Sequence, residues 1–219
     1  DAAMLPPVQD QVRLEGFGAA CDPQVSATAM SGAMIQLDLF APCDRETSVS
    51  ITHGALSFSE RTDASGALTL DIPAFQAHVD LRVSVLDRKP VGVSVRVPDA
   101  IWYDRVGLMW DGDEALSIHA SGAGSSERVV QPRIAAEFPG AEGVLMRLGG
   151  TDGHTSKMAE VFSFPSGYVT KPDTVQFSVK ATVTPSNCDK TVPVRAIRSL
   201  RGDTLRGEQL SVAFPGCGA

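Results

Sequence analysis

The sequence lacks several features that identify common classes of function. Aromatic residues are 6% of its 219 residues, and its lysines and arginines are scattered singly through a chain of formal net charge −7. Because no basic run or stripe can follow a phosphate backbone, we do not expect nucleic-acid binding. No apolar run approaches the roughly 18 residues of a membrane-spanning helix, so we expect no membrane span within these residues.

Catalytic motifs are also missing. The chain has no G-x-S-x-G nucleophile elbow, and the segment WDGDE (110–114) lacks the spacing of an EF-hand calcium loop. The histidines are spread over separate segments: His53, His78, His119 and His154. We therefore assign no catalytic, cofactor-binding or metal-binding residue, and we expect a protein that is not an enzyme and holds no cofactor.

One loop combines backbone freedom with groups that could bind a metal. GGTDGHTSK (149–157) contains Asp152 and His154 among three glycines. Calcium takes six to eight oxygen ligands and zinc three or four nitrogen, sulfur or oxygen ligands, so these two residues would need help from the acidic segment 111–114. A solvated hairpin loop is the simpler interpretation.

The four cysteines are Cys21, Cys43, Cys188 and Cys217, two near each end of the chain and none in a C-x-x-C pair. Their spacing argues against zinc and thioredoxin-like sites. An even number in two clusters favours the disulfides Cys21–Cys43 and Cys188–Cys217, although three pairings are formally available. Disulfides imply an oxidising compartment, whereas the alternative of four buried thiols would suit the cytosol.

Hydrophobic residues make up 43% of the chain, enough for a large core. Alternating apolar and polar residues predict short strands at near-regular spacing, as in a β-sandwich. In the first half these segments are 34–40, 48–52, 55–62, 67–74, 78–86 and 91–98. A two-residue turn at His53-Gly54 would make a hairpin of the second and third segments.

The stretch DASGALTLDI (63–72) shows the pattern most clearly. Asp63 can bond the backbone ahead of it, and Gly66 accepts a positive φ, so residues 63–66 predict a turn. The following strand has an apolar face and a polar face. We expect Leu68, Leu70 and Ile72 to point inward, and Thr69 and Asp71 to face solvent.

The second half is also rich in strands. The predicted segments are 101–110, 115–121, 143–150, 159–165, 174–184, 190–197 and 207–214. The one helix that the pattern supports is 129–138, with Pro132 in its first turn and Pro139-Gly140 after it. The fold class is therefore all-β: one or two disulfide-stapled antiparallel β-sandwiches with at most one short helix. Residues 1–20 would be a linker or arm, 21–99 a sandwich, and 100–219 a second β-rich domain or a continuation of the same sandwich.

Two resemblances add to this interpretation. The hairpin Thr62–Leu70, T-D-x-x-G followed by an alternating strand that reaches Pro73, resembles that of carboxypeptidase-regulatory-like and transthyretin-like domains, which are secreted β-sandwiches with structural or adhesive roles. The whole chain is similar to an uncharacterised family of exported bacterial envelope proteins loosely labelled "translocase". The features that carry this are APC (41–43), TDASG (62–66), YDRVGLMW (103–110), AEVFSFP (159–165), Asn187-Cys188 and Cys217. This second resemblance implies export and supplies no activity.

Trp102, Tyr103 and Trp110 are the candidates for a binding surface. With a period of two, Trp102 and Trp110 fall on the same strand face, where they would either pack in the core or contact a partner. We predict a non-enzymatic, periplasmic or extracellular accessory subunit that binds another envelope or membrane protein, with room for an anchoring segment outside these residues. Two alternatives remain open. A carbohydrate- or small-ligand-binding module would need Trp102 or Trp110 in a polar groove, and a hydrolase or metal-dependent enzyme would need a cleft where His119 or His154 meets a carboxylate.

Overall fold

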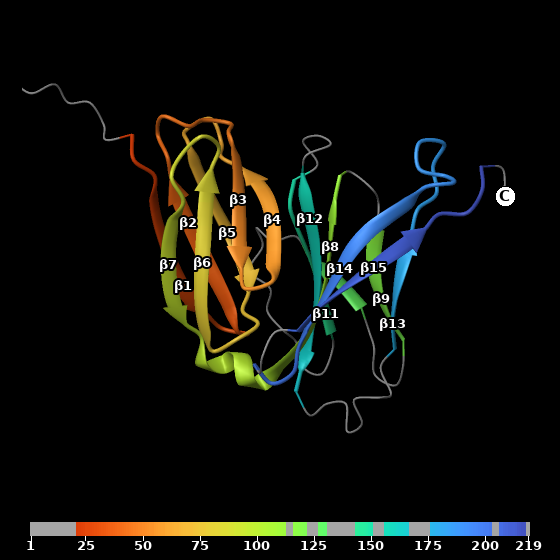
Figure 1. The fold of residues 1–219 in the computed structure, drawn as a ribbon. Coiled ribbons are helices and arrows are strands. Elements are labelled where there is room, and N and C mark those ends of the chain that lie inside the picture. The colour runs from red at the N-terminus through yellow and green to blue at the C-terminus, as the bar shows by residue number, and fades with distance from the viewer. Residues whose placement is uncertain are drawn as a thin grey trace, which may run out of the picture.

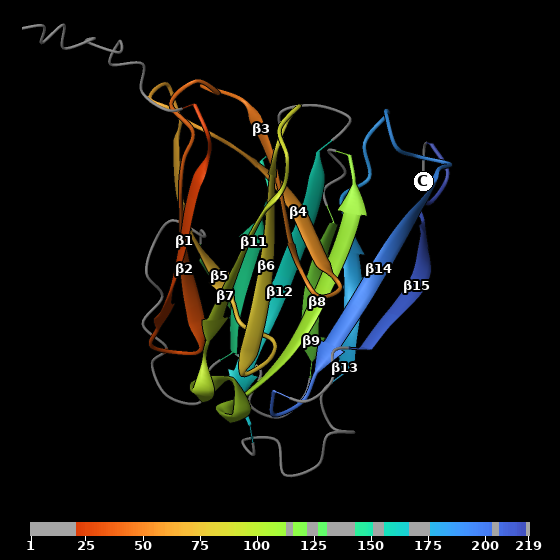
Figure 2. The same ribbon diagram turned by 60° about the vertical axis from the view of Figure 1, so that its left-hand side comes forward.

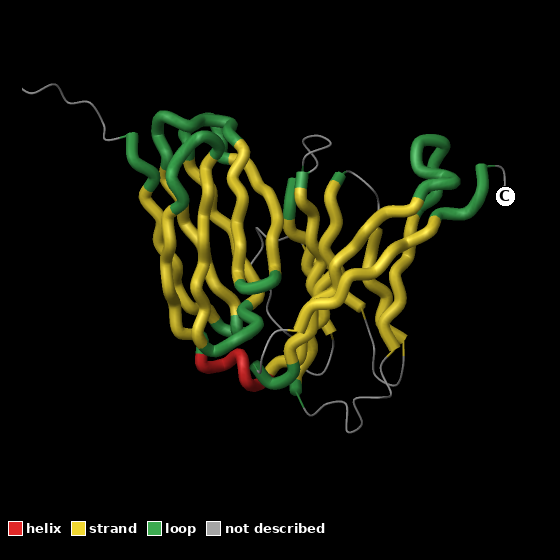
Figure 3. The backbone as a smooth tube through the Cα atoms, viewed as in Figure 1, coloured by secondary structure: helices red, strands yellow, loops and turns green. Residues whose placement is uncertain are grey.

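In a computed structural model of the chain, the structure describes residues 21–112, 116–121, 127–130, 143–150, 156–166, 176–202 and 206–217. The predicted linker 1–20 lies outside these residues. The elements, in chain order, are β1 (Gln24–Met30), β2 (Met34–Phe40), β3 (Ser48–His53), β4 (Leu56–Arg61), β5 (Ala67–Pro73), β6 (His78–Val85), β7 (Val91–Arg96), η1 (Pro98–Trp102), β8 (Tyr103–Asp111), β9 (Leu116–Ser121), β10 (Glu127–Val130), β11 (Gly143–Leu148), β12 (Lys157–Pro165), β13 (Gln176–Ala181), β14 (Thr191–Ser199) and β15 (Arg206–Ala213). The all-β prediction is confirmed, since the one helical element among the described residues is the 3₁₀ helix η1 (Figure 3).

Two predictions of local structure differ from the fold. The predicted helix 129–138 is wrong at Val129 and Val130, which belong to β10 and pair in parallel with β11; its remaining residues lie outside the described part of the chain. Strand β1 was not predicted, because its SATA core has no large apolar residue to show the alternation.

The first seven strands form a two-layer sandwich (Figure 1). A three-stranded sheet, β1–β2–β5, faces a four-stranded sheet, β4–β3–β6–β7, and all neighbours are antiparallel. Alternate side chains of each strand point between the sheets, so that Leu37, Ile51 and Leu81 are each at most 2% exposed. Strand β1 also contacts β7, which closes one side of the sandwich.

The turn before β5 forms as predicted. Asp63 Oδ1 accepts hydrogen bonds from the N–H of Ser65 at 2.8 Å and of Ala67 at 2.9 Å. Gly66 has φ +84°, and a Cβ there would lie 2.1 Å from the carbonyl oxygen of Ala41, so only glycine fits. The strand that follows buries Leu68, Leu70 and Ile72 and exposes Thr69, which confirms the predicted inward face. Asp71, which was expected to face solvent, is half-buried.

The six-stranded sheet, β10–β11–β12–β8–β14–β15, lies between the first sandwich and the two-stranded sheet (Figure 2), and its strand β14 alternates between buried and exposed residues. On β12, Ala159 and Val161 join the core of the first sandwich, whereas Met158, Phe162 and Phe164 pack in a second core beneath the two-stranded sheet β9–β13. A strand with one solvated face alternates between buried and exposed residues. The near-continuous burial of β12 follows from its having no solvated face.

The strands form two groups, the first sandwich (β1–β7) and the strands that follow it (β8–β15), and β4 connects them. Gly149, just after β11, donates its N–H to Oε1 of Glu60 at 2.9 Å, and Gly150 donates to the carbonyl of Ser59 at 3.0 Å. The first two glycines of the loop 149–157 therefore anchor it to the sandwich. Asp152 and His154, the groups considered as metal ligands, lie outside the described residues.

Candidate functional site

The three aromatic residues chosen as a binding surface are separated. Trp102 ends η1 and is 65% exposed, Tyr103 is half-buried against the first core, and Trp110 is 4% exposed in the second core. The prediction that Trp102 and Trp110 share a strand face is wrong. Pro98 lies at the start of a 3₁₀ helix, and the strand begins only after Trp102, so the period of two does not reach back to that residue.

The helix η1 is held against the turn between β14 and β15. Oδ1 of Asp104 accepts hydrogen bonds from the backbone N–H of Arg201 at 2.7 Å and from the hydroxyl of Ser166 at 2.8 Å. The Ser166 N–H in turn donates to the carbonyl of Trp102 at 2.7 Å. A Cβ on Gly202, which has φ +66°, would lie 3.1 Å from backbone atoms of η1, so the turn approaches as closely as glycine allows.

Three large apolar side chains are exposed on η1 and this turn: Ile101 at 44%, Trp102 at 65% and Leu200 at 37%. We call these three residues the η1 surface. The backbone beside them is held by hydrogen bonds, since Asp104 bonds to Arg201, the neighbour of Leu200, and Ser166 bonds to the Trp102 carbonyl. Tyr103, the next residue after Trp102, has its ring centroid 5.1 Å from the guanidinium carbon of Arg105.

Arg105 is a buried cation at the junction of the two groups of strands. Its guanidinium donates to the carbonyl oxygens of Ala74, Gly32 and Ala33 in the first sandwich. Its Nε donates to Oγ of Ser163 on β12 at 3.0 Å. The side chain is 1% exposed, and no carboxylate among the described residues bonds to it. Burial lowers the pKa of Arg105 to about 9, which leaves it a cation at neutral pH.

A buried carboxylate lies on the opposite face of the six-stranded sheet, the face that packs against the two-stranded sheet. Glu160 on β12 is 1% exposed and accepts hydrogen bonds from the Ile118 N–H of β9 at 2.8 Å and from Nε of Arg147 on β11 at 2.9 Å. It therefore connects the two-stranded sheet to the six-stranded one. Both buried charges act in packing between sheets.

His53 is buried in the first sandwich and bonded to its backbone. The sequence predicted it in a hairpin turn with Gly54, but it is the last residue of β3, pairs with Leu56, and is 1% exposed; the two-residue turn is Gly54-Ala55. Its Nε2 accepts the Phe75 N–H at 3.2 Å, so this nitrogen is unprotonated. Burial, with a smaller contribution from the charge of Arg105, lowers the pKa of His53 to about 4.

The other histidines lie apart from His53. His78 begins β6 and is exposed, and His119 is a half-buried residue of β9, in a different sheet. His154 is outside the described residues. The structure therefore does not bring His53, His78 and His119 together.

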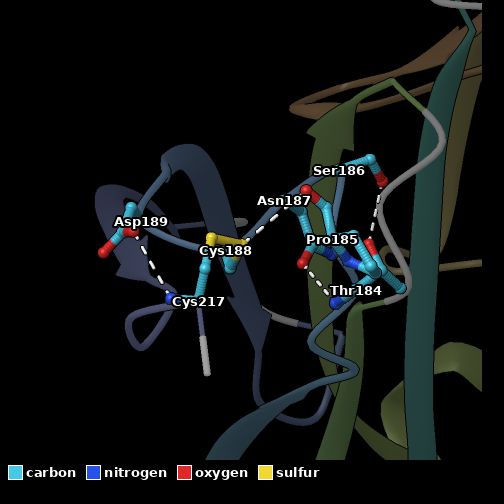
Figure 4. The surroundings of a disulfide bond; sticks show 7 residues. All are labelled: Thr184, Pro185, Ser186, Asn187, Cys188, Asp189 and Cys217. Carbon is cyan, nitrogen blue, oxygen red and sulfur yellow. Dashed lines mark hydrogen bonds between the residues drawn. A yellow bond between two sulfur atoms is a disulfide. The ribbon is translucent and has the colours of Figure 1, made fainter. Parts of the chain in front are cut away.

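Both predicted disulfides are present. Cys21 pairs with Cys43, and Cys188 pairs with Cys217, with Cα–Cα distances of 5.3 and 5.0 Å. Figure 4 shows the second bridge beside a turn that Asn187 stabilises by accepting the Thr184 N–H at 2.7 Å. Asp189 also lies there, but both sulfurs are in the disulfide and offer no thiolate to a metal. The two bridges indicate an oxidising, extracytoplasmic environment.

A cleft of about 320 Å³ opens between the β3–β4 hairpin and the six-stranded sheet. It was not foreseen from the sequence, because its walls come from segments up to about 150 residues apart that share no motif. The hairpin contributes Ala55 and Ser57, and the sheet contributes Met109, Trp110, Asp111, Lys157, Pro193, Val194, Arg195 and Gln209.

Comparisons of the chain with protein-family models, with curated proteins and with solved structures give no match in any of the three. In the described part of the chain, no helix is both long and apolar enough to cross a membrane.

Proposed function

We propose that this protein is a non-enzymatic accessory subunit of the bacterial envelope, periplasmic or extracellular, that binds another envelope or membrane protein through the η1 surface. The observation that carries the proposal is the exposure of Trp102 on a rigid element. Burying the indole of a tryptophan gives a large gain in free energy, and tryptophan is enriched among the residues that dominate protein–protein binding.

The support beneath Trp102 favours binding over an accidental exposure. Asp104, Ser166 and the Gly202 turn fix the backbone of η1 before any partner arrives. A preorganised anchor loses little conformational entropy on binding, so more of its contact energy appears as affinity. Ile101 and Leu200 are further exposed apolar residues on η1 and the adjoining turn.

The location of the η1 surface also suits an accessory subunit. The helix η1 lies between the two groups of strands at one end of the molecule (Figures 1 and 3), and it is followed in the chain by Arg105, which bonds to Ser163. A partner that binds there would lie close to both groups of strands, so its affinity would depend on their relative position. The two disulfides would preserve that arrangement outside the cytoplasm.

Co-purification from native envelopes tests this proposal. The full-length protein and its Trp102→Ala variant are each purified under gentle detergent extraction, and their partners are identified by mass spectrometry. We expect one partner whose recovery with Trp102→Ala falls at least about tenfold, because loss of a tryptophan anchor commonly costs about 2 kcal/mol or more.

Leu86→Ala is the matched control, since Leu86 is 59% exposed beyond the end of β6, outside the η1 surface. It should leave recovery unchanged. Equal recovery with Trp102→Ala and wild type, both folded, would contradict the proposal.

A further inference from the structure

The cleft beside the β3–β4 hairpin has a polar wall built from four strands that are neighbours in the sheet, β12, β8, β14 and β15. Lys157 on β12 pairs with Asp111 on β8, and Arg195 on β14 pairs with Met109 on β8 and Gln209 on β15. Residues paired across antiparallel strands place their side chains on the same face, with Cβ atoms about 5 Å apart. Since Met109 belongs to the core of the first sandwich, all four polar side chains rise from the face that looks toward the hairpin.

These four polar side chains make no hydrogen bond or ion pair within the described part of the chain. Asp111 and Lys157 are direct cross-strand neighbours of opposite charge, yet they form no salt bridge there. Two other pairs of opposite charge are bonded, Arg147 to Glu160 and Arg88 to Asp44. The cleft gathers in one place charged side chains that have no bonding partner among the described residues.

The cleft contains two cationic side chains, Lys157 and Arg195, and one carboxylate, Asp111. A guanidinium binds a carboxylate through two parallel hydrogen bonds, and a lysine ammonium adds a second, point-like cation. The carboxylate of Asp111 would repel an anion but would accept hydrogen bonds from an ammonium group. The presence of both signs of charge in one cleft fits a ligand that carries both charges.

The remaining lining sets the size of such a ligand. Gln209 and Ser57 provide uncharged donors and acceptors, and the Met109 sulfur, which accepts the Ser57 N–H at 3.2 Å, forms an apolar floor. A volume of about 320 Å³ lies at the lower end of the range for small-molecule sites. It suits a molecule of amino-acid or dipeptide size.

We infer that this cleft binds a small zwitterion, an amino acid or dipeptide, with its α-carboxylate on Arg195 and Lys157 and its ammonium group on Asp111. The inference is independent of the η1 surface, because no residue of that surface lines the cleft.

The test is two-dimensional NMR of the full chain, titrated with each of the twenty common amino acids and with L-alanyl-L-alanine. At least one probe should bind saturably and shift the backbone amides of Met109, Asp111, Lys157 and Arg195. The same probe with its carboxylate converted to an amide should bind at least about tenfold more weakly, because a charged hydrogen-bonded pair is lost.

Variants locate the site. Arg195→Gln should reduce affinity for the acid at least about tenfold and remove the preference for the acid over its amide. Asp111→Asn should reduce affinity for the free amine at least about tenfold and remove the preference for the free amine over its N-acetyl form. Arg96→Gln, on strand β7 outside the cleft, should leave binding unchanged. The inference is overturned if no probe in the set binds saturably, or if a probe binds but Arg195→Gln and Asp111→Asn bind it as wild type does.

Discussion

Nη2 of Arg105 lies 2.9 Å from the carbonyl oxygen of Ala33, a residue 72 positions earlier in the chain. Ala33 has φ +56°, an unfavourable conformation for a residue with a side chain. This conformation occurs in the β1–β2 turn, where Gly32 and Ala33 present their carbonyls to the guanidinium. A strand of the second group thus holds a turn of the first through buried hydrogen bonds.

Replacing Arg105 by methionine should therefore destabilise the fold strongly. The carbonyls of Gly32, Ala33 and Ala74 would lose a donor in a buried site, and an unsatisfied buried acceptor costs about 1–3 kcal/mol. Urea unfolding of Arg105→Met, followed by circular dichroism, should show a loss of about 3 kcal/mol or more. Arg82→Gln, at an exposed position of β6, should change stability by less than about 0.5 kcal/mol, and equal effects of the two substitutions would contradict this role of Arg105.

The buried His53 should make stability depend on pH. Its pKa is about 4 in the folded protein and near 6.5 when unfolded, so the unfolded chain binds the proton more readily. The stability that neutral His53 contributes is complete above pH 6.5 and is lost as the pH falls toward 4. A pKa difference of about 2.5 corresponds to roughly 3 kcal/mol.

The variant His53→Gln separates this effect from the titration of carboxylates. Glutamine keeps an acceptor for the Phe75 N–H but does not titrate. Between pH 7 and pH 4 the variant should lose about 3 kcal/mol less stability than wild type. Parallel stability curves for the two proteins would show that His53 does not titrate as described.

The faces of β5 predict opposite effects of substitution at adjacent residues. Leu70 is 2% exposed, and Leu70→Asp should cost about 4 kcal/mol or more because it buries an unpaired carboxylate. Thr69→Lys should change stability by less than about 1 kcal/mol, since residue 69 is exposed and borders Asp38. Thermal melts of the two variants check the register, and equal losses would mean that the strand is misplaced.

Aspartate would be a poor control at residue 69. Thr69 donates to Asp38, and the pKa of nearby Asp71 is raised by burial and by the charge of Asp38. A third carboxylate would add repulsion unrelated to burial.

Each disulfide should contribute separately. The bridges close loops with sequence separations of 22 and 29 residues, for which the chain-entropy model gives about 3 kcal/mol each. Double serine variants, C21S/C43S and C188S/C217S, should each lose about that amount in urea unfolding. Non-reducing peptide mapping should recover only these two pairs, and crossed pairs or free thiols in the oxidised protein would contradict the assignment.

Local patterns were sufficient for most strands. The strands β2 through β9 and β11 through β15 were predicted from alternating apolar residues, whereas two residues of β10 were assigned to a helix; the Asp63 turn was predicted with its bonding. The failures have physical causes. β1 has small residues where alternation would show, and Pro98 starts a helical turn before a run that otherwise appears as strand.

The candidate sites were less accessible to sequence reasoning. Arg105 lies in a strand whose burial depends on a sandwich more than 30 residues away, so no local pattern distinguishes it from a surface arginine. Trp102 was named as a candidate from its residue type and neighbours, whereas its exposure follows from η1 and the Gly202 turn. The cleft exists only because β12, β8, β14 and β15 are neighbours in one sheet.

The most direct test of the central claim is site-specific photo-crosslinking in the native host. A photoreactive phenylalanine analogue replaces Trp102 in one strain and Leu86, which is also well exposed, in another, and envelopes are irradiated before extraction. We expect one discrete adduct from position 102, containing an envelope or membrane protein, and none from position 86. No adduct from position 102 in a folded protein, or the same adducts from both positions, would contradict binding through the η1 surface.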